Sequence, residues 1–287
     1  MTGDVVGSDW QRFWERGGFW RAVLLTVLYS ALYLGASALV GVVAGDLVDP
    51  DDPFADATSV LVGLAVPIAL GVVLLVAFGA SVRWLGEAFG PQPVRGAGWM
   101  WVLPVAALAF NGLRFAAADY AAYAATTVVM ILVAGLCVGA AEELLCRGYV
   151  VLLLRRHGYG ERAVAVLSAL LFALLHSTNL LGGQTLATVG LTVVYAFFFG
   201  IAMYLTLRVT GRLIWPVLLH ASTDASLFLL VGGIDTAAAT GATATLGSTS
   251  TLATVAGLAN VVVIGLGLVL VWFIRGRVPA RAEPVDA

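Results

Sequence analysis

The chain contains no lysine, and only 11% of its 287 residues are charged. Its formal net charge of −2 excludes a broad basic surface, so a nucleic acid is not expected as a partner. The only two cysteines, Cys137 and Cys146, form neither a CxxC motif nor a pattern typical of disulfides. We expect both to be small buried hydrophobic residues, and they indicate no redox function.

Long apolar runs make up most of the chain. Hydrophobic residues account for 61% of it, well above the composition of soluble globular proteins, and many runs are long enough to cross a bilayer as helices. We therefore predict an all-α fold, a polytopic transmembrane helix bundle with about eight spans. The expected spans cover approximately residues 20–44, 59–82, 98–118, 121–156, 162–180, 186–207, 213–231 and 252–274.

Arginine residues are concentrated in alternate loops, with Arg114 near the end of the third span as the exception. Because short cytoplasmic loops are enriched in basic residues, we expect an integral membrane protein with both termini in the cytoplasm.

Residues 9–19 can form either a short interfacial helix or a flexible tail. Residues 234–250 are nearly all Ala, Thr, Gly and Ser, and we expect a mobile loop there.

Two adjacent carboxylates, Glu142 and Glu143, stand at the end of the apolar run 121–141. An ionisable group costs about 2.5–3.5 kcal/mol at the centre of a membrane helix. Glu143 and Arg147 share a helix face and can pair, whereas Glu142 points about 100° away from that face. We expect a structural role for Glu143 and a chemical role for Glu142.

Two of the three histidines also lie inside apolar spans. Glu142 and His176 are equally far in sequence from Tyr159, in the turn between the fourth and fifth spans, so an antiparallel hairpin places them at about the same depth. His220 and Asp224 share one face of the seventh span. Buried histidines also join helices in bundles, but burying all these ionisable groups together without a function would be costly.

Three motifs in this region resemble those of the CPBP family, which comprises CAAX prenyl endopeptidases of the Ras-converting type and bacterial bacteriocin-processing or immunity homologues. They lie on three separate spans within about residues 125–231 and read Glu142-Glu143-x-x-x-Arg147, Phe172-x-x-x-His176 and His220-x-x-x-Asp224. The resemblance implies an intramembrane endopeptidase of the bacterial cell membrane, with helices that open to the cytosol.

The resemblance also implies the roles of these residues. Glu142 and His176 would activate water, and His220 with Asp224 would stabilise the oxyanion. The supporting residues that shape the site would be Glu143, Arg147 and Phe172. The implied partners are the lipid bilayer and a membrane-associated peptide or protein substrate, with or without a prenyl group. The chain then divides into an N-terminal part (1–120), a catalytic bundle (121–233) and a C-terminal part (234–287).

Asp224 stands where the prenyl endopeptidases usually have asparagine. An ionised aspartate accepts hydrogen bonds but cannot donate one to a developing oxyanion. Asp224 can instead orient His220, remain protonated or help to bind a metal. The sequence therefore leaves open whether prenylated proteins are the substrate.

Peptide hydrolysis by these residues can be metal-free or metal-dependent. Without metal, Glu142 acts as the general base, because a carboxylate in apolar surroundings binds a proton more tightly, and His220 donates to the oxyanion. With one Zn²⁺, His176 and His220 would be ligands together with Asp224 or Glu142, leaving an open position for water. The HExxH motif is absent, and spacing does not decide between the two.

Non-catalytic interpretations compete with both. Glu143 and Arg147 can form a plain ion pair, Glu142 can solvate a helix end, Phe172 can face lipid, and His220 with Asp224 can join helices. The chain would then be a proton-linked transporter, a membrane scaffold, or an immunity protein that binds a peptide without cleaving it.

Overall fold

The computed structural model describes residues 8–231 and 251–279. Within these residues, eight helical segments are long and apolar enough to cross a membrane. The spans are Phe19–Leu47, Ala57–Ser81, Gly98–Ala117, Ala125–Arg156, Glu161–Leu180, Leu186–Thr210, Ile214–Val231 and Thr251–Phe273. The predicted all-α polytopic bundle is confirmed, and the predicted limits agree with these spans to within a few residues.

Several spans combine an α-helix with a shorter helical segment. The α-helices are α1 (Asp9–Glu15), α2 (Phe19–Ala44), α3 (Ala57–Val60), α4 (Val66–Ser81), α5 (Leu85–Phe89), α6 (Val102–Ala117), α7 (Ala125–Glu143), α8 (Val151–Arg156), α9 (Glu161–Leu175), α10 (Leu186–Thr210), α11 (Ile214–Val231), α14 (Thr251–Gly257) and α15 (Ala259–Leu270). The π-helical segments are η2 (Leu61–Ala65) and η5 (Leu144–Val150). The 3₁₀ segments are η1 (Gly45–Leu47), η3 (Gly98–Trp101), η4 (Tyr120–Ala122), η6 (His176–Leu180) and η7 (Val271–Phe273).

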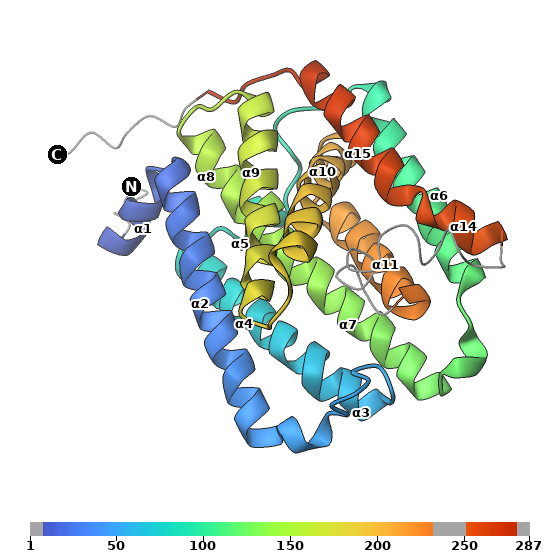
Figure 1. Ribbon diagram of the computed structural model, residues 1–287. Helices are drawn as coiled ribbons and strands as arrows, with labels where there is room; N and C mark the ends of the chain where they lie inside the picture. The colour runs from blue at the N-terminus through green and yellow to red at the C-terminus, as the bar shows by residue number, and fades with distance from the viewer. Residues whose placement is uncertain (1–7, 232–250, 280–287) are drawn as a thin grey trace.

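The fourth span, built from α7, η5 and α8, crosses the middle of the molecule (Figure 1). α11 packs along one side of α7 and α4 along another, while α10 packs on α9 and α2 on α4. α6 and α15 lie farther out, next to α11 and α10 respectively. Outer helices expose large apolar side chains, such as Val42 of α2 at 85%, as expected for a surface in contact with lipid.

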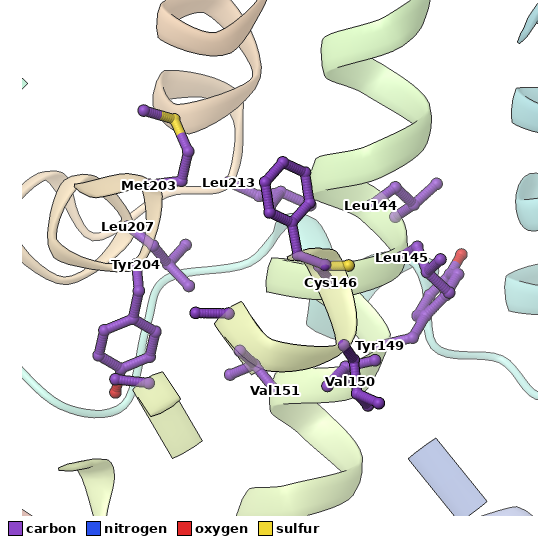
Figure 2. Close-up of a cluster of buried hydrophobic side chains, with 14 of the residues drawn as sticks. Leu144, Leu145, Cys146, Tyr149, Val150, Val151, Met203, Tyr204, Leu207 and Leu213 are labelled. Atoms are coloured by element: carbon purple, nitrogen blue, oxygen red, sulfur yellow. The ribbon is translucent and has the colours of Figure 1, made fainter. Parts of the chain in front are cut away.

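The π segment η5 lies at the centre of the apolar core, where all seven of its residues are buried. Figure 2 shows its side chains gathered with Met203, Tyr204 and Leu207 of α10. Cys146 is buried here, as predicted, while Cys137 is only partly buried. The sequence predicted an uninterrupted α-helix through this region, but the structure has a π-helical segment at Leu144–Val150. Such turns are frequent at functional sites.

Short local signals fix the ends of the helices. Ser8 and Gln11 form a capping box at the start of α1, and Trp14 of this helix is only 1% exposed, so residues 9–15 form a docked helix rather than a flexible tail. Gly158 adopts φ +80° in the turn between α8 and α9 and reverses the chain there, as predicted. The mobile loop expected at residues 234–250 lies outside the described residues.

Candidate active site

A stripe of small residues brings α7 and α11 unusually close. A Cβ atom at Gly139 would lie 2.6 Å from the carbonyl oxygen of Val217, and one at Gly135 would lie 2.8 Å from that of Ala221. Real Cβ atoms do not approach backbone this closely, so only glycine permits this packing at the two positions. Glu143 continues the same face of α7 one turn after Gly139, and it therefore meets α11 directly.

His220 of α11 is the point at which three carboxylates converge. Its Nδ1 is 2.7 Å from Oε1 of Glu143, within hydrogen-bonding distance. Its Nε2 lies 3.6 Å from Oε2 of Glu142 and 3.4 Å from Oδ2 of Asp224. His220 is 2% exposed, so these contacts form away from bulk solvent. If Nδ1 carries a proton for Glu143, the opposite nitrogen is directed at the two other carboxylates.

Glu143 also contacts Arg147, at 3.2 Å between Oε1 and Nη1, and both side chains are fully buried. The Arg147 guanidinium donates a hydrogen bond from Nη2 to the Gly200 carbonyl at 2.8 Å and lies over the Phe172 ring at 4.5 Å. A Cβ atom at Gly200 would lie 2.9 Å from Nη2, so glycine leaves the room that the guanidinium needs. Glu143 thus links a fixed cation to the imidazole of His220.

Phe172 supports both imidazoles. Its ring centroid lies 5.3 Å from that of His176 and 5.6 Å from that of His220, each in an edge-on geometry. It is only 1% exposed, so the interpretation of Phe172 as lipid-facing is wrong. Edge-on contacts of this kind restrict how the imidazoles can turn, which fixes the direction of their nitrogens.

The polar side chains open into a cavity of about 240 Å³. Glu142, His176, His220 and Asp224 all line it, so the structure brings together the four residues that the sequence singled out. The Glu142 side chain is 20% exposed and that of Asp224 is 14% exposed, whereas the side chain of Glu143 is fully buried. Glu142 is therefore accessible to a molecule in the cavity and Glu143 is not.

Further cavity residues were not identified from the sequence. Asn179, Tyr195 and Thr223 line the cavity, and Thr223 accepts a hydrogen bond from Asn111 of α6 at 2.8 Å. Asn111 also receives a hydrogen bond from Arg114, which is only 3% exposed and was the exception among the arginines. Asn111 and Arg114 are polar residues within an otherwise apolar span, and this was a signal in the sequence that α6 contacts the site.

The zinc site considered from the sequence requires at least three protein ligands around one point. Among residues 8–231 and 251–279, no group of three His, Cys, Asp or Glu side chains is arranged to hold a metal ion. Glu142 and Asp224 approach the Nε2 atom of His220 at 3.6 and 3.4 Å, whereas Glu143 approaches its Nδ1 atom at 2.7 Å, and these contacts have the geometry of ion pairs. The arrangement therefore does not fit the zinc ligand set.

Residues 124–226, from the start of α7 to within α11, match the family model described as Rce1-like, type II CAAX prenyl endopeptidase Rce1-like. Comparison with curated proteins and comparison with solved structures gave no match. The matched segment contains all seven residues of the three motifs. At the level of the family it supports a CAAX-type intramembrane protease. Residues 124–226 thus match the model of the type II CAAX prenyl endopeptidase Rce1-like domain, and this match is consistent with the CPBP family of intramembrane proteases.

Proposed function

We propose that this protein hydrolyses a peptide bond of a membrane-associated substrate with water activated by Glu142. The observation that carries the proposal is the approach of Glu142 to the Nε2 atom of His220, at 3.6 Å, in a cavity that His176 also lines. Amide hydrolysis requires a general base and a hydrogen-bond donor side by side at the wall of a cavity that can admit water and a peptide group.

In this reaction Glu142 accepts a proton from water as the water oxygen attacks the carbonyl carbon of the scissile bond. His176 holds the same water with Glu142. The carbonyl oxygen becomes an oxyanion, which accepts a hydrogen bond from the Nε2–H group of His220. Glu142 then returns the proton to the leaving nitrogen as the C–N bond breaks, so the base also serves as the acid.

Glu143 is assigned to positioning. It holds the Nδ1–H group of His220 and thereby directs Nε2 towards the cavity, as a carboxylate does for the histidine of other hydrolytic sites. Arg147 balances the charge of Glu143. Asp224, when ionised, accepts a hydrogen bond from the Nε2–H group of His220 and keeps that proton at the cavity until the oxyanion forms.

We further propose that the chain divides into a catalytic bundle (121–233) and two flanking parts (1–120 and 234–287), that the described helices of the flanking parts pack around the bundle, and that both termini lie in the cytoplasm. The proposed substrate is a peptide that ends in a CAAX sequence and carries a prenyl group, in line with the description of the matched family. Reporter fusions at each end of the chain test the orientation.

The proposal is tested with Glu142→Gln in purified protein reconstituted into nanodiscs, using a prenylated, fluorescence-quenched CAAX peptide. Glutamine has nearly the same shape but cannot accept a proton from water, so kcat should fall by about 10²–10⁴-fold, the range of lost general-base catalysis. Glu87→Gln is the matched control, because Glu87 pairs with Arg156 outside the cavity and its side chain is 44% exposed. Cleavage by Glu142→Gln at the wild-type rate would refute the proposal.

A further inference from the structure

A second, smaller cavity adjoins the site on the side of α2. It has a volume of about 120 Å³, and Glu142, His176 and Asn179 line it as well as the larger cavity. Its remaining polar wall comes mainly from α2, which lies outside the residues that match the family model. Glu142 therefore stands where two chambers meet, and the first span supplies part of one of them.

Tyr29 and Tyr33 form the wall of the small chamber on α2. They lie one helical turn apart and their rings stack, with centroids 6.1 Å apart and planes 16° from parallel. Glu142 lines the same chamber as both phenols. Within the described part of the chain neither hydroxyl makes a hydrogen bond, although Tyr29 is only 7% exposed. Both phenols line the chamber, so the donor capacity of their hydroxyl groups is not used within the protein and is available to a molecule that enters it.

The opposite helix leaves room for these side chains. Gly71 of α4 lies against them, and a Cβ atom at this position would lie 2.7 Å from Oη of Tyr29 and 3.4 Å from Cδ2 of Tyr33. A side chain at residue 71 would therefore collide with the Tyr29 hydroxyl in its present position. The position of the Tyr29 hydroxyl therefore depends on both α2 and α4.

A protease cleaves its substrate in an extended form, which leaves backbone carbonyl groups without their helical partners. Within a membrane such groups have no water to bind and need donors from the protein. We propose that Tyr29 and Tyr33 donate hydrogen bonds to backbone carbonyls of an extended peptide that lies across Glu142. This assignment rests on the proposed function, and it makes the first span a substrate-binding element of the site.

The test measures binding without cleavage. The probe is a prenylated CAAX peptide whose scissile bond is replaced by a hydroxyethylene isostere, and its Kd is measured for full-length protein in nanodiscs. Tyr29→Phe and Tyr33→Phe remove one hydroxyl each and should weaken binding about tenfold, as expected for a carbonyl left without a donor. Tyr120→Phe is the matched control, since its hydroxyl binds the Phe115 carbonyl at 2.9 Å outside both chambers.

Gly71→Ala provides a second, independent variant. The new methyl group should displace the Tyr29 hydroxyl and weaken binding about tenfold in the wild-type background, but have no further effect in the Tyr29→Phe background. Gly35→Ala is its control, because a Cβ atom there has no neighbour within 4 Å. Alanine favours helix more than glycine does, so weaker binding by Gly71→Ala cannot be assigned to loss of helix.

Wild-type Kd values for both phenylalanine variants would overturn the inference. It would also be overturned if the variants had lower melting temperatures but wild-type Kd values. That result is distinct from a failure of the proposed function, which is read from cleavage by Glu142→Gln. If Glu142→Gln cleaves normally while the tyrosine variants bind the isostere weakly, the tyrosines still bind peptide and only the assigned base is wrong.

Discussion

Replacing Gly139 by alanine tests whether the spacing between α7 and α11 creates the active site. The added Cβ atom would lie 2.6 Å from the Val217 carbonyl oxygen and 2.9 Å from the Ala221 nitrogen. Carbon atoms require about 3.5 Å from such neighbours, so α11 must move away by roughly 1 Å. Backbone atoms block the methyl group here, and they cannot turn aside as a side chain can.

The consequence for the site follows from the hydrogen bond between Nδ1 of His220 and Oε1 of Glu143. It measures 2.7 Å, and a displacement of roughly 1 Å lengthens it beyond hydrogen-bonding range. Misplacement of a catalytic group by this much costs about 10²-fold in rate. Overpacking costs about 1–3 kcal/mol, and the higher helix propensity of alanine offsets about 1 kcal/mol of that, so the expected loss of stability is small.

We therefore expect Gly139→Ala to lower kcat by about 10²-fold, with only a modest fall in melting temperature, when the prenylated CAAX peptide is cleaved in nanodiscs. Gly35→Ala should change neither quantity, because nothing lies within 4 Å of a Cβ atom there. Full activity of Gly139→Ala would refute the reasoning, because it would mean that the site does not depend on the close approach of the two helices.

Three other outcomes follow from the same geometry. Glu143→Gln leaves Arg147 buried without a balancing charge and weakens the hydrogen bond to His220. The free energy of unfolding should therefore fall by about 3–5 kcal/mol and kcat by about 10²-fold. A stable, fully active variant would contradict the positioning role. Arg147→Lys keeps a positive charge but loses the planar fork that reaches Gly200 and covers Phe172, so the melting temperature should fall, and an unchanged value would refute the role of these contacts. Because the described residues form no three-ligand group, a metal chelator should leave cleavage unchanged; loss of activity that added Zn²⁺ restores would show a metal-dependent reaction.

Hydropathy was sufficient to predict the architecture. A bilayer fixes the length of each helix and demands apolar side chains along it, so the eight spans and the turn after α8 could be located from composition and glycine positions alone. The grouping of Glu142 with His176 also followed from geometry, since helices with a constant rise place residues equally far from a turn at equal depth.

The sequence did not predict which faces of the helices meet. α2 is apolar around its whole circumference, so no pattern indicates that Tyr29 and Tyr33 point inward, and their contact with Gly71 depends on tertiary packing. The second partner of Glu143 was missed for the same reason, because only the approach of α11 brings His220 to it. The spacing Gly135-x-x-x-Gly139 was an available signal of that approach, since paired small residues permit close helix packing in membranes.

The charges in and next to the cavity are matched in a way that suits hydrolysis inside a membrane. Glu142, Glu143 and Asp224 can supply three negative charges, against one permanent positive charge on Arg147 and up to two on the imidazoles. Net charge is costly to bury, so protons must be shared among these groups until the total is near zero. In the proposed reaction, the negative charge that Glu142 loses when it takes a proton from water reappears on the oxyanion beside His220. The proposed reaction would then move charge over a few ångströms within the site without adding any to the membrane interior, so a cavity inside the bundle can still support it.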